Sequence, residues 1–494
     1  RRSSDLTSRI VLESLGIEDY GIYNLVGGIV TIFAFLNSAM IATSQRFISY
    51  ELGKGNLHKL KDVFCTTLTI HIAIAFIIVV LSEVIGVWFL NTKLNIPSDR
   101  MMAANWTLQL SIFVFAVNVI SVPYNASIVA HEKMSAFAYI SIFEVSLKLA
   151  IAYLLLFISY DKLIVYSILV FCVALLLRSL YCFYCKRHFE ECHYTFSFNI
   201  EQFREMFAFA GWSLVGNLGF SFKDQLSNIL LNLFFGTVVN AARGISVQVG
   251  SLINSFSANF MMAMNPQITK SYAVGDLYRS KELVYAGCRF SFYLLAVISL
   301  PIMINITYIL NLWLVEVPQY TDIFLILTIV CNLLYAISSP LTTAMQATGR
   351  IKWFQVIICI VMLTELPIAY LLLSIGYPPY SVLYASLFVT LLGVLIRIVL
   401  ISRILPIYEI RYYVTHIFSK NILIVFITYC IAYILHKKME QDSFFTAVLS
   451  SFILELILFS LAYLCGLSST ERYVVNQKLV TILESKRRKN KQKK

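Results

Sequence analysis

Polar side chains follow one face of the apolar stretch 206–236, and they are of types that could bind sugars or ions. At about 100° of rotation per residue, one helical face collects Asn217, Ser221, Asp224, Gln225, Asn228 and Asn232. Amide groups both donate and accept hydrogen bonds, as sugar hydroxyls do, and the carboxylate of Asp224 could bind a cation or a proton. Lys223 falls on a different side of this helix. The spacing therefore predicts a polar stripe from which the lysine is excluded.

A second stripe follows in the stretch 237–266, where one helical face collects Arg243, Gly250, Asn254, Ser257 and Asn265. The planar guanidinium of arginine suits phosphate groups. Two consecutive polar helices predict a shared water-filled cavity, because a charge inside the membrane usually faces a cavity or a partner. Hydrogen bonds between neighbouring helices, which Asn and Ser often supply, are the alternative interpretation.

Charged residues also interrupt other apolar stretches. Glu144 and Lys148 stand in the order and spacing that favour an ion pair along a helix. Glu365 takes the place of Lys148 when the two halves of the chain are aligned, as described below. Asp224, Glu144 and Glu365 are the candidates for binding a coupling proton or sodium ion. Arg397, near the end of a span, is expected to extend its side chain to the membrane surface.

The elements that must position these groups are apolar helices. Of the 494 residues, 59% are hydrophobic and 13% are charged, and the mean hydropathy is +0.76, whereas soluble domains carry about 25% charged residues. The apolar residues form blocks of about 20, the length of a helix that crosses a membrane, without the alternation of a barrel. The sequence therefore predicts an all-α polytopic membrane protein with about 13 spans. The spans are expected at about 22–43, 64–90, 107–130, 135–158, 162–185, 206–236, 237–266, 284–311, 320–347, 351–374, 380–402, 417–436 and 444–465.

Two internal matches divide the chain into similar halves. Residues Gln45–Gly53 share their Gln, Ser, Tyr and Gly with residues Gln267–Gly275, and after a two-residue gap a Leu and two basic residues follow in register. Residues 123–156 match residues 340–373 without a gap. Such a duplication predicts two pseudo-symmetric six-helix lobes, followed by two additional C-terminal helices.

The duplication also predicts the boundaries along the chain. The first lobe shows one span fewer than the second, which predicts an incomplete first helix ending near Arg9 and about 14 spans for the complete number. The expected parts are an N-terminal lobe at 1–185, a cytoplasmic linker at 186–205, a C-terminal lobe at 206–402, two additional transmembrane helices at 403–465 and a basic cytoplasmic tail at 466–494.

Lys and Arg concentrate in one set of loops and in the C-terminal tail, which predicts that the repeated hairpins and the tail are cytoplasmic. We expect the tail to contact anionic membrane lipids. This asymmetry accounts for the net charge of +12 without nucleic acid as a partner. Cys182, Cys185 and His188 do not match the spacing of a zinc site, so neither a metal nor a cofactor is expected. Because common catalytic motifs are absent from the sequence, we also do not expect an enzyme.

Several short segments are more specific than the general pattern. They read SRIVL and LGIEDYGIYN within residues 8–24, QRF at 45–47, VPYNA at 122–126, HEK at 131–133 and NAARG at 240–244. In these segments the chain resembles the oligosaccharide-lipid (Wzx-like) flippases of the multidrug/oligosaccharidyl-lipid/polysaccharide exporter superfamily. The resemblance covers residues 8 to about 465. It implies two six-helix lobes around a V-shaped cavity, and the flipping of undecaprenyl-diphosphate-linked oligosaccharides across the bacterial inner membrane.

The residues and the resemblance combine into one hypothesis. Arg243, together with Arg9, Arg46 or Lys148, attracts the diphosphate of a lipid-linked oligosaccharide, and the Asn and Gln stripes bind its sugar hydroxyls. Alternating access is driven by the membrane potential or by H+ or Na+. The product serves cell-surface polysaccharide assembly, such as O-antigen for lipopolysaccharide, with polysaccharide-assembly proteins as candidate partners.

Two alternatives remain open at this point. A drug/cation antiporter of the same superfamily should have a net acidic cavity. A membrane glycan polymerase or glycosyltransferase would usually need a larger polar loop outside the membrane than the loop at about 91–106.

Overall fold

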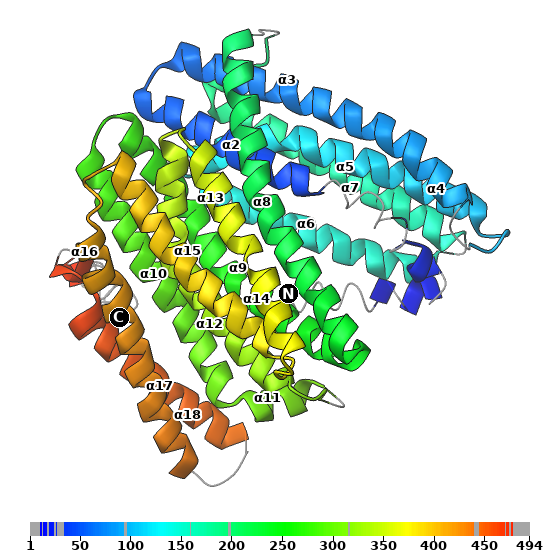
Figure 1. Ribbon diagram of the computed structural model, residues 1–494. Coiled ribbons are helices and arrows are strands. Elements are labelled where there is room, and N and C mark those ends of the chain that lie inside the picture. Colours follow the sequence, from blue (N-terminus) through cyan, green and yellow to red (C-terminus); the bar gives the residue numbers. More distant parts are fainter. Residues whose placement is uncertain are drawn as a thin grey trace, which may run out of the picture. The chain divides into compact units, whose positions relative to one another are not determined.

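In the computed structural model, the regular elements of the described residues are helices, joined by turns and short irregular connections (Figure 1). The described residues are 10–11, 13–16, 19–23, 26, 34–92, 96–158, 160–195, 199–314, 317–438, 444–469, 471–473 and 476–477. The all-α fold class predicted from the sequence is confirmed. The α-helices are α2 (Ala34–Lys54), α3 (Leu57–Leu81), α4 (Val87–Thr92), α5 (Met101–Ala130), α6 (Met134–Leu154), α7 (Lys162–His188), α8 (Ile200–Phe235), α9 (Thr237–Ala273), α10 (Leu277–Ile304), α11 (Ile306–Trp313), α12 (Thr321–Ala347), α13 (Lys352–Leu363), α14 (Glu365–Ser374), α15 (Ser381–Ile404), α16 (Ile410–Tyr412), α17 (Lys420–Lys438) and α18 (Phe444–Leu461).

Among the described residues, 10 helical segments are long and apolar enough to cross a membrane. They include the segments 57–92, 101–130, 277–304 and 444–466. The helices α8 and α9, which the sequence also predicts as spans, fall outside this set although they have 36 and 37 residues. Their polar stripes lower their mean hydropathy, so these two helices are long enough but not apolar enough to be included.

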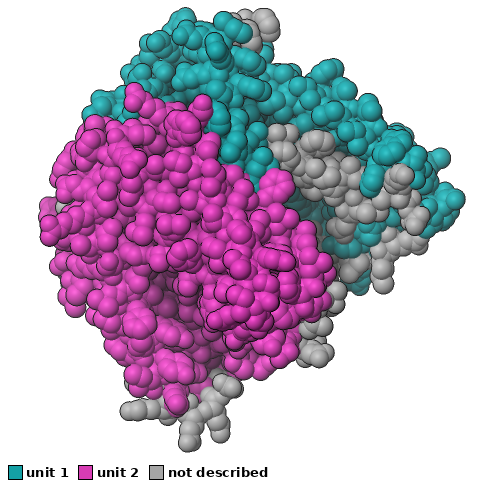
Figure 2. Space-filling view, in the orientation of Figure 1, with its two compact units in different colours: residues 1–218, 269–275 teal, residues 219–268, 276–494 magenta. Residues whose placement is uncertain are grey.

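The chain divides into two compact units, which Figure 2 shows in separate colours. Unit 1 contains residues 1–218 and 269–275, and unit 2 contains residues 219–268 and 276–494. The first division therefore falls within α8, and the last turn of α9 belongs to unit 1. The predicted limits of the lobes, the linker and the tail stay predictions.

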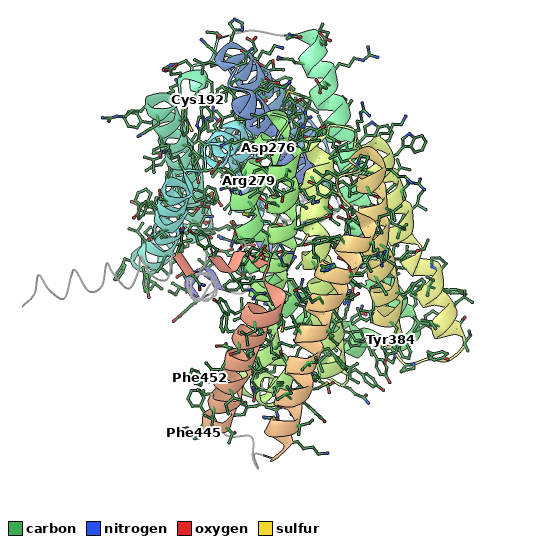
Figure 3. All side chains as sticks on the ribbon, turned by 90° about the vertical axis from the view of Figure 1, so that its left-hand side faces the viewer. Cys192, Asp276, Arg279, Tyr384, Phe445 and Phe452 are labelled. Carbon is green, nitrogen blue, oxygen red and sulfur yellow. The ribbon has the colours of Figure 1, made fainter. Side chains whose placement is uncertain are left out.

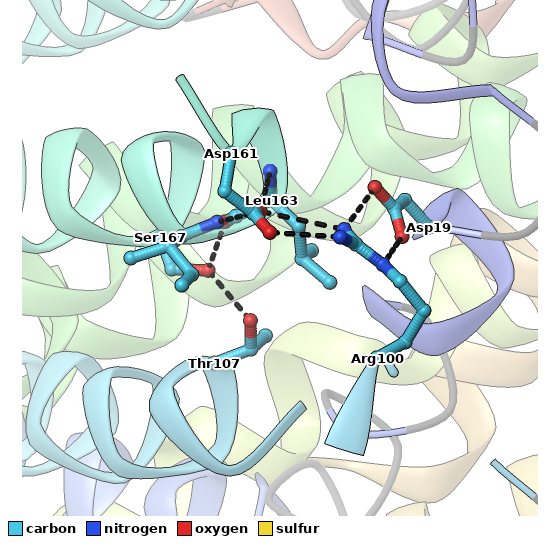
Figure 4. A network of polar contacts seen from close by, with 7 residues as sticks. Asp19, Arg100, Thr107, Asp161, Leu163 and Ser167 are labelled. Atoms are coloured by element: carbon cyan, nitrogen blue, oxygen red, sulfur yellow. Dashed lines mark hydrogen bonds and ion pairs between the residues drawn. The ribbon is translucent and has the colours of Figure 1, made fainter. Parts of the chain in front are cut away.

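In unit 1, Arg100 joins three segments of the chain (Figure 4). Its Nε donates a hydrogen bond to Oδ1 of Asp19 at 2.7 Å, and its Nη1 donates to Oδ2 of Asp161 at 2.8 Å. Asp161 is also the N-cap of α7, where its side chain accepts from two backbone N–H groups. Further along α7, Ser167 donates to the hydroxyl of Thr107 on α5 at 3.1 Å. These polar contacts fix the ends of α5 and α7 to each other.

The repeated hairpin has the same turn in both copies. Gly55 and Gly275 have φ angles of +69° and +83°, in the region that a residue without a Cβ adopts most readily. Asn56 and Asp276 follow these glycines and cap α3 and α10 with their side chains, and Figure 3 shows Asp276 at its place in the fold. The sequence alignment paired Gly53 with Gly275, so the structure moves the two-residue gap from after the glycine to before it.

Gly53 has a different role, because it lies where α2 meets the last turn of α9 within unit 1. A Cβ atom at Gly53 would lie 2.7 Å from the Cα of Lys270. The rings of Tyr50 and Tyr272 are 6.5 Å apart, and Nζ of Lys270 lies 2.7 Å from a carboxylate oxygen of Glu132. The two copies of the repeated motif therefore contact each other directly.

In unit 2, α12 packs against α10 and α15, and α15 also packs against α13 and α14. The helix formed by α13 and α14 is interrupted at Thr364. Pro367 explains the interruption, because proline lacks the N–H that would bond to the carbonyl of Leu363. Glu365 consequently lies in the first turn of α14, where the positive end of the helix dipole favours a carboxylate.

Large apolar side chains remain exposed along the outer helices. Phe445 and Phe452 of α18 are 72% and 58% exposed, and Tyr384 of α15 is also exposed (Figure 3). Exposed aromatic residues in this number indicate helices whose surfaces contact lipid rather than water.

Candidate functional site

A cavity of about 350 Å³ lies within unit 2, between α8, α9, α12, α13 and α15. Its volume is in the range of small-molecule sites, about 300–1,000 Å³. The polar groups that line it come from four of these helices and include both charges of the two predicted stripes. They are Lys223, Asp224, Arg243, Ser251, Asn254, Thr328, Asn332, Ser386 and Thr390.

Four charged side chains form a chain of ion pairs beside this cavity. Nζ of Lys223 lies 3.1 Å from Oε2 of Glu365 and 3.5 Å from Oδ1 of Asp224. Nη2 of Arg243 lies 3.9 Å from the same oxygen of Asp224. The order along the chain is Glu365, Lys223, Asp224, Arg243, so that each carboxylate has a basic partner and the charges balance.

The structure contradicts the prediction that Lys223 points away from the polar stripe. A helical wheel places a side chain by the direction of its Cβ alone, but the flexible stem of lysine can carry its ammonium group around the helix. The ammonium group does so here to reach Glu365, which is 0% exposed and would be costly to bury without a partner. The presence of a lysine inside an apolar span was itself a usable signal.

Arg243 is 5% exposed and lines the cavity. Its Nη1 donates to the hydroxyl of Thr328 at 3.4 Å. Its Nε is buried and has no hydrogen-bond partner among the residues that the structure describes, so the guanidinium keeps a donor for a further acceptor. Close approach of α9 to α12 beside it depends on Gly250, where a Cβ would lie 2.7 Å from Cγ2 of Thr328.

The other predicted members of the stripes divide between the cavity and its surroundings. Asn254 lines the cavity. Asn265 instead accepts a hydrogen bond from Thr343 on α12 at 2.8 Å, which matches the alternative interpretation of the stripes. Asn217 belongs to unit 1, where it donates to Ser38 at 3.0 Å. Three further residues, Gln225, Asn228 and Asn232, are not among the residues that line the cavity.

Two of the predicted basic residues lie in unit 1 and already have contacts there. Arg46 is buried, with its guanidinium 4.4 Å from the ring centre of Phe47 and 3.9 Å from a carboxylate oxygen of Glu205. Lys148 lies 2.6 Å from Glu144, which confirms the ion pair predicted from their spacing. Arg9 lies outside the described residues. The binding roles assigned to Arg46, Arg9, Lys148 and Glu144 stay predictions.

The expectation that Arg397 extends to the membrane surface is wrong. Its side chain is 2% exposed, Nη1 donates to Ser338 at 3.2 Å, and the guanidinium lies 5.4 Å from the ring centre of Tyr335. The hydroxyl and the aromatic face give the cation partial compensation for burial. Tyr335 also lines the cavity, so Arg397 supports the cavity wall from behind.

Two protein-family models match parts of the sequence. The family model for polysaccharide biosynthesis proteins matches residues 7–272, more than half of the chain. The MatE family model matches residues 213–371, which include most of the cavity. No curated protein sequence matches the chain.

Solved structures of membrane transporters have the same fold. A mutant of a Vibrio cholerae MATE transporter is 14% identical, with a TM-score of 0.68 over 83% of this chain and 94% of that one. A MOP superfamily transporter from Pyrococcus furiosus is 13% identical, with a TM-score of 0.66 over 83% of this chain and 91% of that one. For that protein, a binding pocket of reverse polarity suggests a different function. The present chain belongs to the polysaccharide biosynthesis protein family, and it is a multi-pass membrane transporter of the multidrug/oligosaccharidyl-lipid/polysaccharide exporter superfamily.

Proposed function

We propose that the protein flips undecaprenyl-diphosphate-linked oligosaccharides across the bacterial inner membrane by alternating access, for assembly of a cell-surface polysaccharide. The single observation that carries this proposal is the guanidinium of Arg243 in the cavity of unit 2. It is buried, it is positively charged, and its Nε has no hydrogen-bond partner among the described residues. Arginine is well suited to bind phosphate in this state, because its fork of donors matches the phosphate oxygens.

The surroundings of Arg243 support a ligand that combines charge and hydroxyl groups. Lys223 adds a second cation within the same cavity. Asn254 and Asn332 supply amides that could bind sugar hydroxyls beside the phosphate. In this proposal the diphosphate and the first sugars occupy the polar cavity, while the polyprenyl chain remains in the lipid.

A drug/cation antiporter is the second candidate, favoured by the MatE match at residues 213–371. Such a transporter needs carboxylates that are free to bind a cation. The carboxylates of Asp224 and Glu365 each lie beside a basic side chain of the same unit, so neither carboxylate is free to bind a cation. The reverse polarity described for the pocket of the Pyrococcus furiosus transporter indicates that this fold can accommodate either choice.

The proposal also assigns an orientation to the chain. The repeated hairpins and the C-terminal tail would lie in the cytoplasm, where the lipid-linked oligosaccharide is made, and the sugar would be released on the other side. The basic residues of these segments support that orientation through the positive-inside rule.

The experiment is flipping of a fluorescent undecaprenyl-diphosphate oligosaccharide in proteoliposomes. Arg243→Ala should abolish flipping while leaving membrane insertion intact, because it removes the buried cation that holds the diphosphate. Arg279→Ala is the matched control, since this arginine of unit 2 is exposed and pairs only loosely with Glu282 at 3.8 Å. If Arg243→Ala flips the lipid as fast as Arg279→Ala, the role of Arg243 is refuted.

A further inference from the structure

A second cavity in unit 2, of about 420 Å³, lies between α18 and the segment that contains Asn305 and α11. It shares no lining residue with the cavity that contains Arg243. The lining residues on α18 recur at intervals of three and four, so they form one face of that helix. They are Phe444, Ala447, Val448, Ser451, Phe452 and Glu455, of which Figure 3 labels Phe452.

The helix α18 is among the least covered helices in the described part of the chain. Within the span Phe444–Gly466, 17% of the most apolar stretch is buried inside the molecule, compared with 67% for the span Leu277–Ile304. Ala447 and Ser451 have short side chains, which leave the hollow between the larger side chains around them. Short side chains at such places let the backbone of a neighbouring membrane helix approach closely.

The carboxylate of Glu455 lines this cavity without a partner. Glu455 is the middle residue of the span Phe444–Gly466, where a charged side chain is costly and usually faces a cavity or a partner. It makes no hydrogen bond or ion pair with any residue that the structure describes. Glu83, Glu144 and Glu365, which lie in other spans, each have a partner within 3.1 Å. The carboxylate of Glu455 is therefore available to a group from another molecule.

The amide and hydroxyl groups near Glu455 bind each other. Nδ2 of Asn305 donates to the hydroxyl of Ser451 at 3.3 Å, and Oδ1 of Asn305 accepts from Ser450 at 3.2 Å. The residues that line the cavity include one acidic residue and no Lys, Arg or His. A partner that complements this cavity must therefore supply the cation.

We propose that this face of α18 docks a transmembrane helix of a partner protein, and that a lysine or arginine near the middle of that helix pairs with Glu455. A helix fits better than a free cation, because the lining residues extend along about three turns of α18, from Phe444 to Glu455. Binding at this face requires neither Arg243 nor its cavity, so it does not depend on the proposed function.

A second copy of this chain would complement the face poorly. Two α18 helices in contact through this face would bring two Glu455 carboxylates toward each other, and the face supplies no cation to compensate them. Like charges close together disfavour the charged form of both groups. A helix with a basic residue provides the missing charge instead.

A suitable probe is a synthetic transmembrane peptide of about 21 leucine and alanine residues with one lysine at its centre. The matched peptide has leucine there. The full-length protein and either peptide are reconstituted in phosphatidylcholine liposomes. Binding is measured by energy transfer from the tryptophans of the protein, including Trp313 at the end of α11, to a dansyl group on the peptide. We expect wild type to bind the lysine peptide about tenfold more tightly, the effect of one interhelical polar contact.

Glu455→Gln keeps the shape of the side chain and removes its charge, so this variant should bind both peptides equally. Glu83→Gln is the matched control, because Glu83 also lies within a span but already accepts a hydrogen bond from Gln109 at 2.7 Å. It should keep the preference for lysine. If wild type does not distinguish the peptides, or if Glu455→Gln still prefers the lysine peptide, the inference is overturned.

The same liposomes distinguish the other occupants. Tetraphenylphosphonium, a lipophilic cation, should not displace the lysine peptide at equal concentration. Complete displacement would show that the cavity binds free organic cations, and it would overturn the docking of a helix. Chemical cross-linking without peptide should give monomers. Dimers of wild type that are lost in Glu455→Gln would identify a second copy as the occupant and would also overturn the inference.

Discussion

A single lysine decides the charge of the cavity in unit 2. Without Lys223, Asp224 in the cavity wall and Glu365 buried behind it would stand against one arginine, and this group of charges would be net acidic, as expected of a cation transporter. With Lys223, both carboxylates have basic partners at 3.1 to 3.9 Å. The net charge of this group therefore depends on Lys223, whose backbone belongs to α8 and whose partner Glu365 belongs to α14.

The first prediction concerns the stability of this ion pair. Lys223→Met leaves Glu365 buried without its cation, and removal of one partner from a buried pair costs about 3–5 kcal/mol. The double variant Lys223→Met with Glu365→Gln should recover most of that loss, because no uncompensated charge remains. Thermal unfolding in detergent measures both. If the double variant is as unstable as Lys223→Met alone, the pair does not support the fold as described.

The sequence predicted the positions of some side chains at the cavity and was wrong about others, for reasons that can be identified. Arg243 and Asn254 could be predicted because both lie on one face of one helix, where periodicity applies. Lys223 and Arg397 could not, because their long side chains reach partners far away in the chain. Periodicity gives the direction of a Cβ atom but not the end of a flexible side chain.

Helices α8 and α9 carry the charged residues that line the cavity, and both helices are more polar than the other spans. The sequence predicts both as membrane spans, and both are helices. Unlike the outer helices, however, neither is apolar enough to be counted among the segments that could cross a membrane. They can remain polar because they pack against α12 and other helices that supply hydrogen-bond partners, such as Asn332 for the carbonyl of Gly250. Polar helices at the cavity and apolar helices at the lipid surface are the division expected of a transporter.

The second prediction concerns the contact between the two copies of the repeated motif. Gly53→Ala places a Cβ 2.7 Å from the backbone of Lys270, so α2 or α9 must shift, at a cost of about 1–3 kcal/mol. Gly211→Ala is the control, because this glycine of α8 has no atom within 4 Å of the added Cβ. Alanine there should raise helix stability by about 0.5–1 kcal/mol. Equal melting temperatures for the two variants would refute the close contact.

The repeat was visible in the sequence, but its register was not fully determined by it. Alignment of identical residues pairs Gly53 with Gly275. In the structure the equivalent of Gly275 is Gly55, because both of these glycines have a positive φ angle and precede a residue that caps a helix. A glycine that is required by conformation and a glycine that is required by close packing look the same in a sequence. The helix break at Thr364 could be anticipated from Pro367, but its use to hold Glu365 at a helix end could not.

At the scale of the whole molecule, the chain combines two compact units with apolar outer helices and a strongly basic balance of charge. The duplication explains why the same turn and the same kind of cap occur in both halves. The charges nevertheless differ between the halves, since Lys148 pairs with Glu144 in one unit and Lys223 pairs with Glu365 in the other. The two units therefore carry different pairs of charged residues within similar repeated elements.

The third prediction concerns membrane topology. Single cysteines introduced by His58→Cys and Val274→Cys, both at exposed sites of the repeated hairpins, should react with an impermeant maleimide only after the cells are opened. Asp99→Cys, in an exposed turn of the opposite set of loops, should react in intact cells. The background must lack the native cysteines. Labelling of all three sites in intact cells would contradict the orientation.

The central claim is that the cavity of this transporter is built for a phosphate-bearing lipid rather than for an organic cation. The most direct test gives both to the same proteoliposomes: a fluorescent undecaprenyl-diphosphate oligosaccharide, and a fluorescent cation with an imposed pH gradient. We predict that the lipid is flipped, that Arg243→Ala stops the flipping, and that the cation is not transported. Transport of the cation in exchange for protons, without any flipping of the lipid, would contradict the account.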